Sequence, residues 1–171
     1  MLSSLLGQAR SLWRAVTLAA LLVFVDAFYL NQGVITALIG AGLLFIGVPR
    51  AFVAKLPQVR RQRFRNLAIY FTAVILVFVV NATNNHIAQT RAEKLVGAVK
   101  AYHAKYRRYP QSLNELIPEF AERIPRAKYT LLFGEFYYAN TERRAFLFYT
   151  SMPPFGRPTY SFANDRWGYL D

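Results

Sequence analysis

The hydrophobic pattern divides the chain into an apolar half and a mixed half. Between residues 15 and 49 the only charged residue is Asp26, and a further apolar run covers residues 67–82. One helix over residues 15–49 would be about 50 Å long at 1.5 Å per residue, which exceeds a hydrocarbon core of roughly 30 Å. Asn31-Gln32-Gly33 has turn chemistry, so the pattern predicts a helical hairpin. We expect three transmembrane helices, over about residues 12–30, 34–53 and 66–84.

Beyond residue 84 the pattern is that of a small folded domain. Apolar residues recur at steps of three and four, which predicts one face of an amphipathic helix over about residues 85–107. The sequence leaves open whether the third span continues into this helix as one long rod. These residues are Ala88, Ala92, Leu95, Val96, Val99, Tyr102, His103 and Tyr106. Tyr109-Pro110 should end the helix. Ser112 followed by Glu115 is a capping-box pattern, and it predicts a short helix over about residues 113–120.

Short aromatic-rich runs follow, separated by Gly, Pro, Asn and Asp, and they predict strands. The runs are residues 128–133, 136–139, 145–151, 159–163 and 166–170. A four- or five-stranded antiparallel sheet packed on the long helix would bury their shared face. The expected fold class is therefore a membrane α-helical domain over residues 1–84, followed by an extracytoplasmic α+β domain over residues 85–171.

A hydrophobic helix that becomes amphipathic, then Tyr-Pro, a short helix and an antiparallel sheet, resembles the plan of type IV pilins and type II secretion pseudopilins. The local match runs from Tyr102 to Pro110 and continues through Ser112 to Leu116. The resemblance covers about residues 66–171 and implies a headgroup-like fold. It does not imply a filament subunit, because two spans precede this region and no prepilin processing site lies before the third span.

Charge adds an orientation to this picture. The net charge is +12, but eight of the 21 Lys and Arg lie before Asn85, where Asp26 is the only acid. The segment between the second and third spans carries Arg60, Arg61, Arg63 and Arg65, a pattern typical of a cytoplasmic loop. We therefore expect the N-terminus and this loop in the cytoplasm of a multi-pass inner-membrane protein. The C-terminal domain then lies outside, in the periplasm of a Gram-negative bacterium.

The first apolar segment, which contains Asp26, has two possible interpretations. Arg10 and Arg14 followed by an apolar run and Val25-Asp26-Ala27 also fit a cleaved signal peptide, although the next apolar segment follows so closely that we prefer an uncleaved span. An acid within a span is a functional candidate. Because Asp26 lies near the expected outer end, we expect it to be interfacial and solvated.

Two sets of residues are candidates for contacts. In the second span, small residues at helical spacing favour close packing of helices, although ordinary membrane-helix composition explains them equally well. They are Ala37, Gly40, Ala41 and Gly47. In the external domain, basic residues interleave with tyrosines at the end of the long helix. This basic/Tyr patch consists of Lys100, Tyr102, Lys105, Tyr106, Arg107, Arg108 and Tyr109.

The basic/Tyr patch could hold an anionic polymer, lipid headgroups or an acidic protein. The alternative is a solvated basic helix end that complements the helix dipole. The expected topology argues against nucleic acid as a partner. The lipid bilayer and other membrane or envelope proteins are the partners we expect.

The sequence offers little catalytic chemistry. It has no cysteine, which excludes disulfides and thiol chemistry, and its two histidines, His86 and His103, lie about 25 Å apart on one continuous helix. Glu115, Glu119 and Glu122 recur at helical spacing, where a solvated face is the ordinary interpretation. We found no phosphate-binding, zinc or calcium-loop motif. We therefore expect a non-catalytic protein without a cofactor or metal, and keep a membrane enzyme as an alternative that no motif favours.

Overall fold

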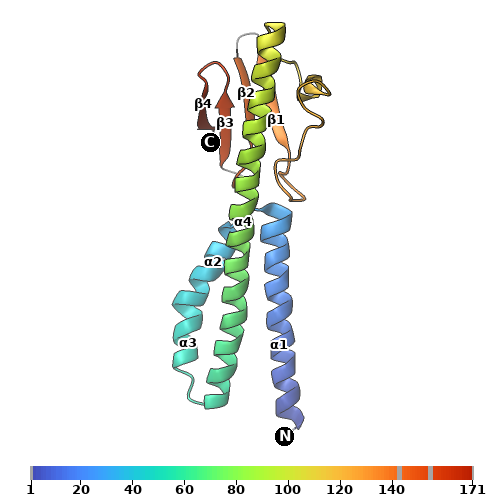
Figure 1. The fold of residues 1–171 in the computed structure, drawn as a ribbon. Helices are drawn as coiled ribbons and strands as arrows, with labels where there is room; N and C mark the ends of the chain where they lie inside the picture. The colour runs from blue at the N-terminus through green and yellow to red at the C-terminus, as the bar shows by residue number, and fades with distance from the viewer. Residues whose placement is uncertain (1, 142–143, 154–155, 171) are drawn as a thin grey trace. The chain divides into compact units, whose positions relative to one another are not determined.

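A computed structural model describes residues 2–141, 144–153 and 156–170. Helix α1 covers Leu2–Val23 and continues through π-helical turns over Phe24–Leu30. Helix α2 covers Val34–Gly42 and leads through π-helical turns over Leu43–Gly47 into α3, Val48–Phe52. Helix α4 is a single helix of 50 residues, Pro57–Tyr106 (Figure 1). The chain divides into two compact units, Met1–Asn81 and Ala82–Asp171.

Among the described residues, three helices are long and apolar enough to cross a membrane, as the hydrophobic pattern predicted. They are Gly7–Leu30, Val34–Phe52 and Pro57–Tyr106. Many of their apolar side chains are not covered by protein; Phe45 is 80% exposed. Such exposure is costly in water and ordinary in lipid, because a membrane-facing side chain needs no protein cover.

The turn between the first two helices lies at Asn31-Gln32-Gly33, as predicted. Asn31 and Gly33 both adopt the left-handed backbone conformation, with φ of 55° and 76°. The carboxylate of Asp26 accepts hydrogen bonds from the backbone N–H of Gln32 (3.3 Å), Gly33 (2.7 Å) and Thr36 (2.9 Å). Asp26 is fully buried, so our expectation of a solvated side chain was wrong. Its oxygens act as an N-terminal cap for α2, because the first N–H groups of a helix have no acceptor within the helix.

The basic segment that we expected as a loop is also helical. Arg60, Arg61, Arg63 and Arg65 lie in the first turns of α4, which begins at Pro57. Proline fits this position because its missing N–H would have no helical acceptor there.

In the second unit, α4 packs one face against a four-stranded antiparallel sheet (Figure 1). The strands are β1 Phe136–Thr141, β2 Arg144–Tyr149, β3 Arg157–Ser161 and β4 Arg166–Leu170, in the order β1-β2-β3-β4. The buried core unites Ala88, Ala92, Leu95, Val96, Val99 and Tyr102 of α4 with alternate residues of β2, namely Ala145, Leu147 and Tyr149. The predicted helix face is thus confirmed from Ala88 to Tyr102, whereas His103 is only half-buried and Tyr106 is 44% exposed.

Two local predictions were wrong. Residues 128–133 do not form a fifth strand, because the N–H groups of Ala127 and Lys128 both bond to the carbonyl of Gly134 and close the segment into a loop. The short helix is only a 3-10 turn, Leu113–Leu116, after which Ile117 is extended. Pro118 explains this early end, since a residue before proline disfavours the helical conformation.

The predicted capping box does not form either. Ser112 makes no side-chain cap bond, and Glu115 accepts a bond from the N–H of Gln111 (2.8 Å).

Candidate interaction surfaces of the C-terminal unit

The end of α4 brings the basic/Tyr patch against acidic residues that follow it in sequence. Tyr109 and Pro110 turn the chain back, so that the 3-10 turn Leu113–Leu116 lies beside the last turns of α4. Tyr102 donates to the Glu115 carboxylate at 2.5 Å, and Tyr106 donates to that of Glu119 at 2.8 Å. Two of the three glutamates that we interpreted as a solvated face, Glu115 and Glu119, are therefore partners of the patch.

Three of the four cations in the patch form ion pairs. Lys100 Nζ lies 2.5 Å from Asp165 Oδ1, Lys105 contacts Glu119, and Arg108 lies 3.2 Å from Glu115. Lys100 and Arg108 also lie over the rings of Tyr160 and Tyr102, each at 5.4 Å. Among the residues that the structure describes, Arg107 is the one patch cation with no ion-pair partner.

The pKa values follow these contacts. The hydrogen bond from Tyr102 lowers the pKa of Glu115, and the bond from Lys105 lowers that of Glu119. The bond to Glu119 raises the pKa of Lys105, and the bond to Asp165 raises that of Lys100. Each pair therefore stays ionised at neutral pH, and most of the charge of the patch is neutralised within the chain.

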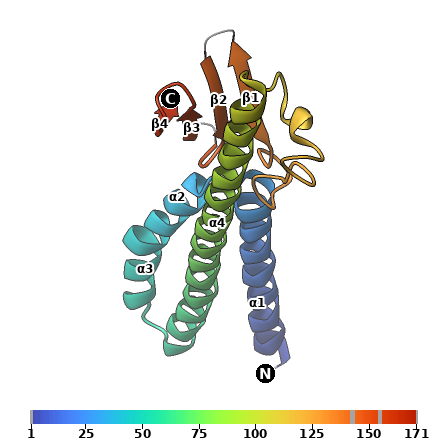
Figure 2. The ribbon, with the colours of Figure 1, turned by 45° about the horizontal axis from the view of Figure 1, so that its top comes forward.

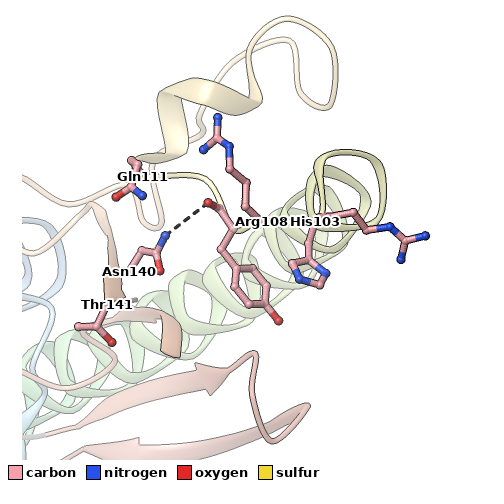
Figure 3. Close-up of a pocket in the computed structure, with 7 residues that line it drawn as sticks. His103, Arg108, Gln111, Asn140 and Thr141 are labelled. Atoms are coloured by element: carbon pink, nitrogen blue, oxygen red, sulfur yellow. Dashed lines mark hydrogen bonds between the residues drawn. The ribbon is translucent and has the colours of Figure 1, made fainter. Parts of the chain in front are cut away.

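A pocket of about 620 Å³ lies at the end of α4. Figure 3 shows His103, Arg108, Gln111, Asn140 and Thr141 around it. Its lining consists of His103, Arg107, Arg108, Tyr109, Gln111, Asn140 and Thr141. The His103 ring stacks on the Tyr109 ring, with centroids 4.3 Å apart. Asn140 donates to the carbonyls of Tyr109 (3.4 Å) and Pro110 (2.9 Å) and so ties β1 to the end of α4. The lining mixes polar and apolar surface, and Arg107 is its cation without an ion-pair partner among the described residues.

The sheet has two edges of different character. Beside β1 runs the chain that follows α4, which Asn140 holds in place. At the other edge, no described segment pairs with the outer side of β4, and none lies beyond it in Figures 1 and 2. Tyr169 and Leu170 of β4 are 74% and 50% exposed. Sequence reasoning found this strand but could not tell that it would be an open edge.

The small residues of the second span divide into two pairs. A Cβ on Gly40 would lie 3.5 Å from Val74 Cγ1, and one on Gly47 would lie 2.9 Å from Leu67 Cδ2, so both glycines pack closely on α4. Ala37 and Ala41 are exposed. Within this set, Gly40 and Gly47 are the members that approach α4 closely.

The remaining chemistry is sparse. In the described residues no three His, Asp or Glu side chains gather as metal ligands would. No known protein family, no curated protein and no solved structure matches the chain.

Proposed function

We propose that this chain is a non-catalytic, multi-pass inner-membrane protein that presents its C-terminal α+β domain to another envelope protein. The observation that carries the proposal is the open, apolar edge of β4. The partner that fits it is an extended segment of another protein, which would add a strand beside β4 through backbone hydrogen bonds.

The composition of β4 supports strand addition. Soluble proteins usually block an exposed edge with lysine, proline or a covering segment, because its unpaired N–H and C=O groups attract other strands. β4 has the sequence RWGYL, with Arg166 as its single charge and no proline. Trp167 anchors the strand to the core by packing on Tyr149 and Tyr160, with ring centroids 6.4 and 5.2 Å apart. A well-anchored strand with exposed Tyr169 and Leu170 is suited to pairing.

The location is part of the same proposal. The arginines from Arg60 to Arg65 precede the apolar run of α4, which favours a cytoplasmic start for this helix. The domain after the run is then periplasmic. The order of helix, Tyr-Pro, short helical turn and antiparallel sheet supports a pilin-like domain, a fold class that serves assembly.

The alternative function is the binding of an anionic polymer or lipid headgroup by the basic/Tyr patch. Its ion pairs with Glu115, Glu119 and Asp165 weigh against this function, because a polymer would have to displace three acids that the chain already supplies. The pocket beside Arg107 is the one feature that favours it. Substituting Arg107 by Glu tests this alternative alone.

The main proposal is tested by co-purification of the full-length protein from its native membranes. We expect Leu170→Asp to abolish recovery of a stoichiometric partner, because a charge on the edge opposes strand pairing. Tyr137→Asp on β1, an exposed aromatic at the other edge, is the matched control and should retain the partner. Both variants must keep the near-ultraviolet circular dichroism of the parent. Equal recovery with both variants, or recovery lost only with Arg107→Glu, would reject the β4 edge.

A further inference from the structure

The loop that replaces the predicted fifth strand has an unusual surface. Its base is closed where the N–H of Ala127 bonds to the carbonyl of Gly134 at 2.7 Å. Inside it, the hydroxyl of the buried Thr130 bonds to the carbonyl of Leu132 at 2.7 Å, and Arg126 donates to the carbonyl of Thr130 at 2.8 Å. These hydrogen bonds close the loop and order its backbone.

Those tip side chains are apolar and exposed. Tyr129 is 60% exposed and Leu131 62%, and Leu132 and Phe133 are each 38% exposed. Four large side chains within five residues, with Thr130 between the first and the second, form one exposed patch, and such patches mark contact surfaces. Exposing these apolar side chains to water without a partner would cost free energy.

The position of the loop along α4 identifies that partner. The N–H of Tyr129 donates to the side-chain oxygen of Asn84 at 3.4 Å. Two turns further along, Arg91 donates to the carbonyl of Arg126 at 2.8 Å and holds its guanidinium over the Tyr129 ring at 4.5 Å. The loop therefore lies against residues 84–91 of α4, at the beginning of the C-terminal unit.

In α4 itself, these residues come directly after the apolar run. Asn84 follows Val80 by four residues, so it lies about 6 Å further along the helix axis at 1.5 Å per residue. The expected end of the third span is at this residue. Tyrosine and arginine are also residues that gather where hydrocarbon meets headgroups, because each joins an apolar body to a polar end.

We propose that loop 127–134 inserts its apolar tip into the lipid interface where α4 leaves the membrane. Leu131, Leu132 and Phe133 enter the boundary between headgroups and acyl chains, and Arg91 and Arg126 lie at the headgroups. The loop is then a second, peripheral membrane contact of the C-terminal domain, additional to the helical spans. This inference does not depend on the β4 edge or on which side of the membrane the domain lies.

Single-cysteine labelling tests it directly, because the chain has no cysteine of its own. Full-length Leu131→Cys, labelled with an environment-sensitive fluorophore, is reconstituted alone into liposomes of phosphatidylethanolamine and phosphatidylglycerol. Quenching is measured with spin-labelled lipid and, separately, with aqueous iodide. The control is Asn164→Cys, an exposed position beside Asp165, which pairs with Lys100. Lys100 lies about 24 Å beyond Asn84 along α4, well away from the interface.

We expect the label at position 131 to be quenched several-fold more by the lipid quencher, and several-fold less by iodide, than the label at position 164. Leu132→Cys provides a second site in case the first variant misfolds. Equal iodide quenching at both positions would overturn the proposal. Protection from both quenchers would also overturn it, because the tip would then be covered by protein.

Discussion

Lys128 is a buried lysine whose pKa is changed by its surroundings. It is the largest fully buried side chain in the chain as described, and its Nζ donates to the carbonyl of Ser151 at 2.6 Å. Burial lowers the pKa of Lys128 to about 7, because the charged form loses its hydration. From the sequence we placed this lysine at the start of a strand and did not anticipate its burial.

The free energy of unfolding should therefore depend on pH through Lys128. The unfolded chain binds this proton up to about pH 10.5, and the folded chain releases it near pH 7, so stability should rise with pH from 7 to 9. Lys128→Met, which leaves no titrating group there, should flatten the rise. The unfolding midpoint is measured as a function of pH for the parent and for Lys128→Met. It is followed in detergent through Trp167 fluorescence, with Trp13 replaced by Phe in both proteins. A rise of equal slope in the two proteins would contradict this role.

Asp26 is a second residue whose environment decides its role. Asp26→Ala would leave the N–H groups of Gln32, Gly33 and Thr36 without their acceptor, at a cost of about 1–3 kcal/mol for an unsatisfied buried group. Asp26→Asn keeps one acceptor oxygen and should cost less. Thermal unfolding in detergent micelles would rank the parent first, Asn second and Ala last. An Ala variant as stable as the parent would show that the cap contributes nothing.

At the scale of elements, glycines set the approach of the second span to α4. Gly47→Leu should destabilise the first unit by about 1–3 kcal/mol, because the new side chain meets Leu67 at once. Gly42→Leu is the matched control in the same span, since a Cβ there meets nothing within 4 Å. The unfolding midpoints of the two variants in detergent make the comparison. Equal loss in both would indicate a general effect of the added volume rather than this packing.

Periodicity explains which elements could be predicted. The steps of three and four from Ala88 to Tyr102 describe the face of α4 that is buried, and the alternation of Ala145, Leu147 and Tyr149 describes the inner face of β2. Residues 128–133 have equally strong strand propensity. They form a loop because local bonds to Gly134 compete successfully with sheet pairing, and propensity carries no information about that competition.

The candidate site was predictable only in part, for a related reason. The basic and aromatic residues of the patch are adjacent in sequence and could be identified together. Their acidic partners lie up to 65 positions away, as in the pair of Lys100 and Asp165, and only the folded chain brings them close. Sequence therefore indicated a charged patch where the structure has a largely neutralised one.

At the scale of the whole molecule, the proposed topology of three spans places the two ends of the chain on opposite sides of the membrane. Reporter fusions after Asn31 and after Asp171 should both report the exterior, and a fusion after Lys55 should report the cytoplasm. Alkaline phosphatase and green fluorescent protein activities distinguish the two locations. A cytoplasmic signal after Asp171 would contradict the proposed periplasmic domain.

The most direct test of the proposed assembly is site-specific photocrosslinking from β4 in native membranes. A photoreactive phenylalanine analogue at position 170 should give one adduct of defined mass in high yield, and the same analogue at position 137 on β1 should not. The account predicts that mass spectrometry of the adduct identifies an extended segment of one envelope protein. No adduct from position 170, or the same adducts from both positions, would contradict it.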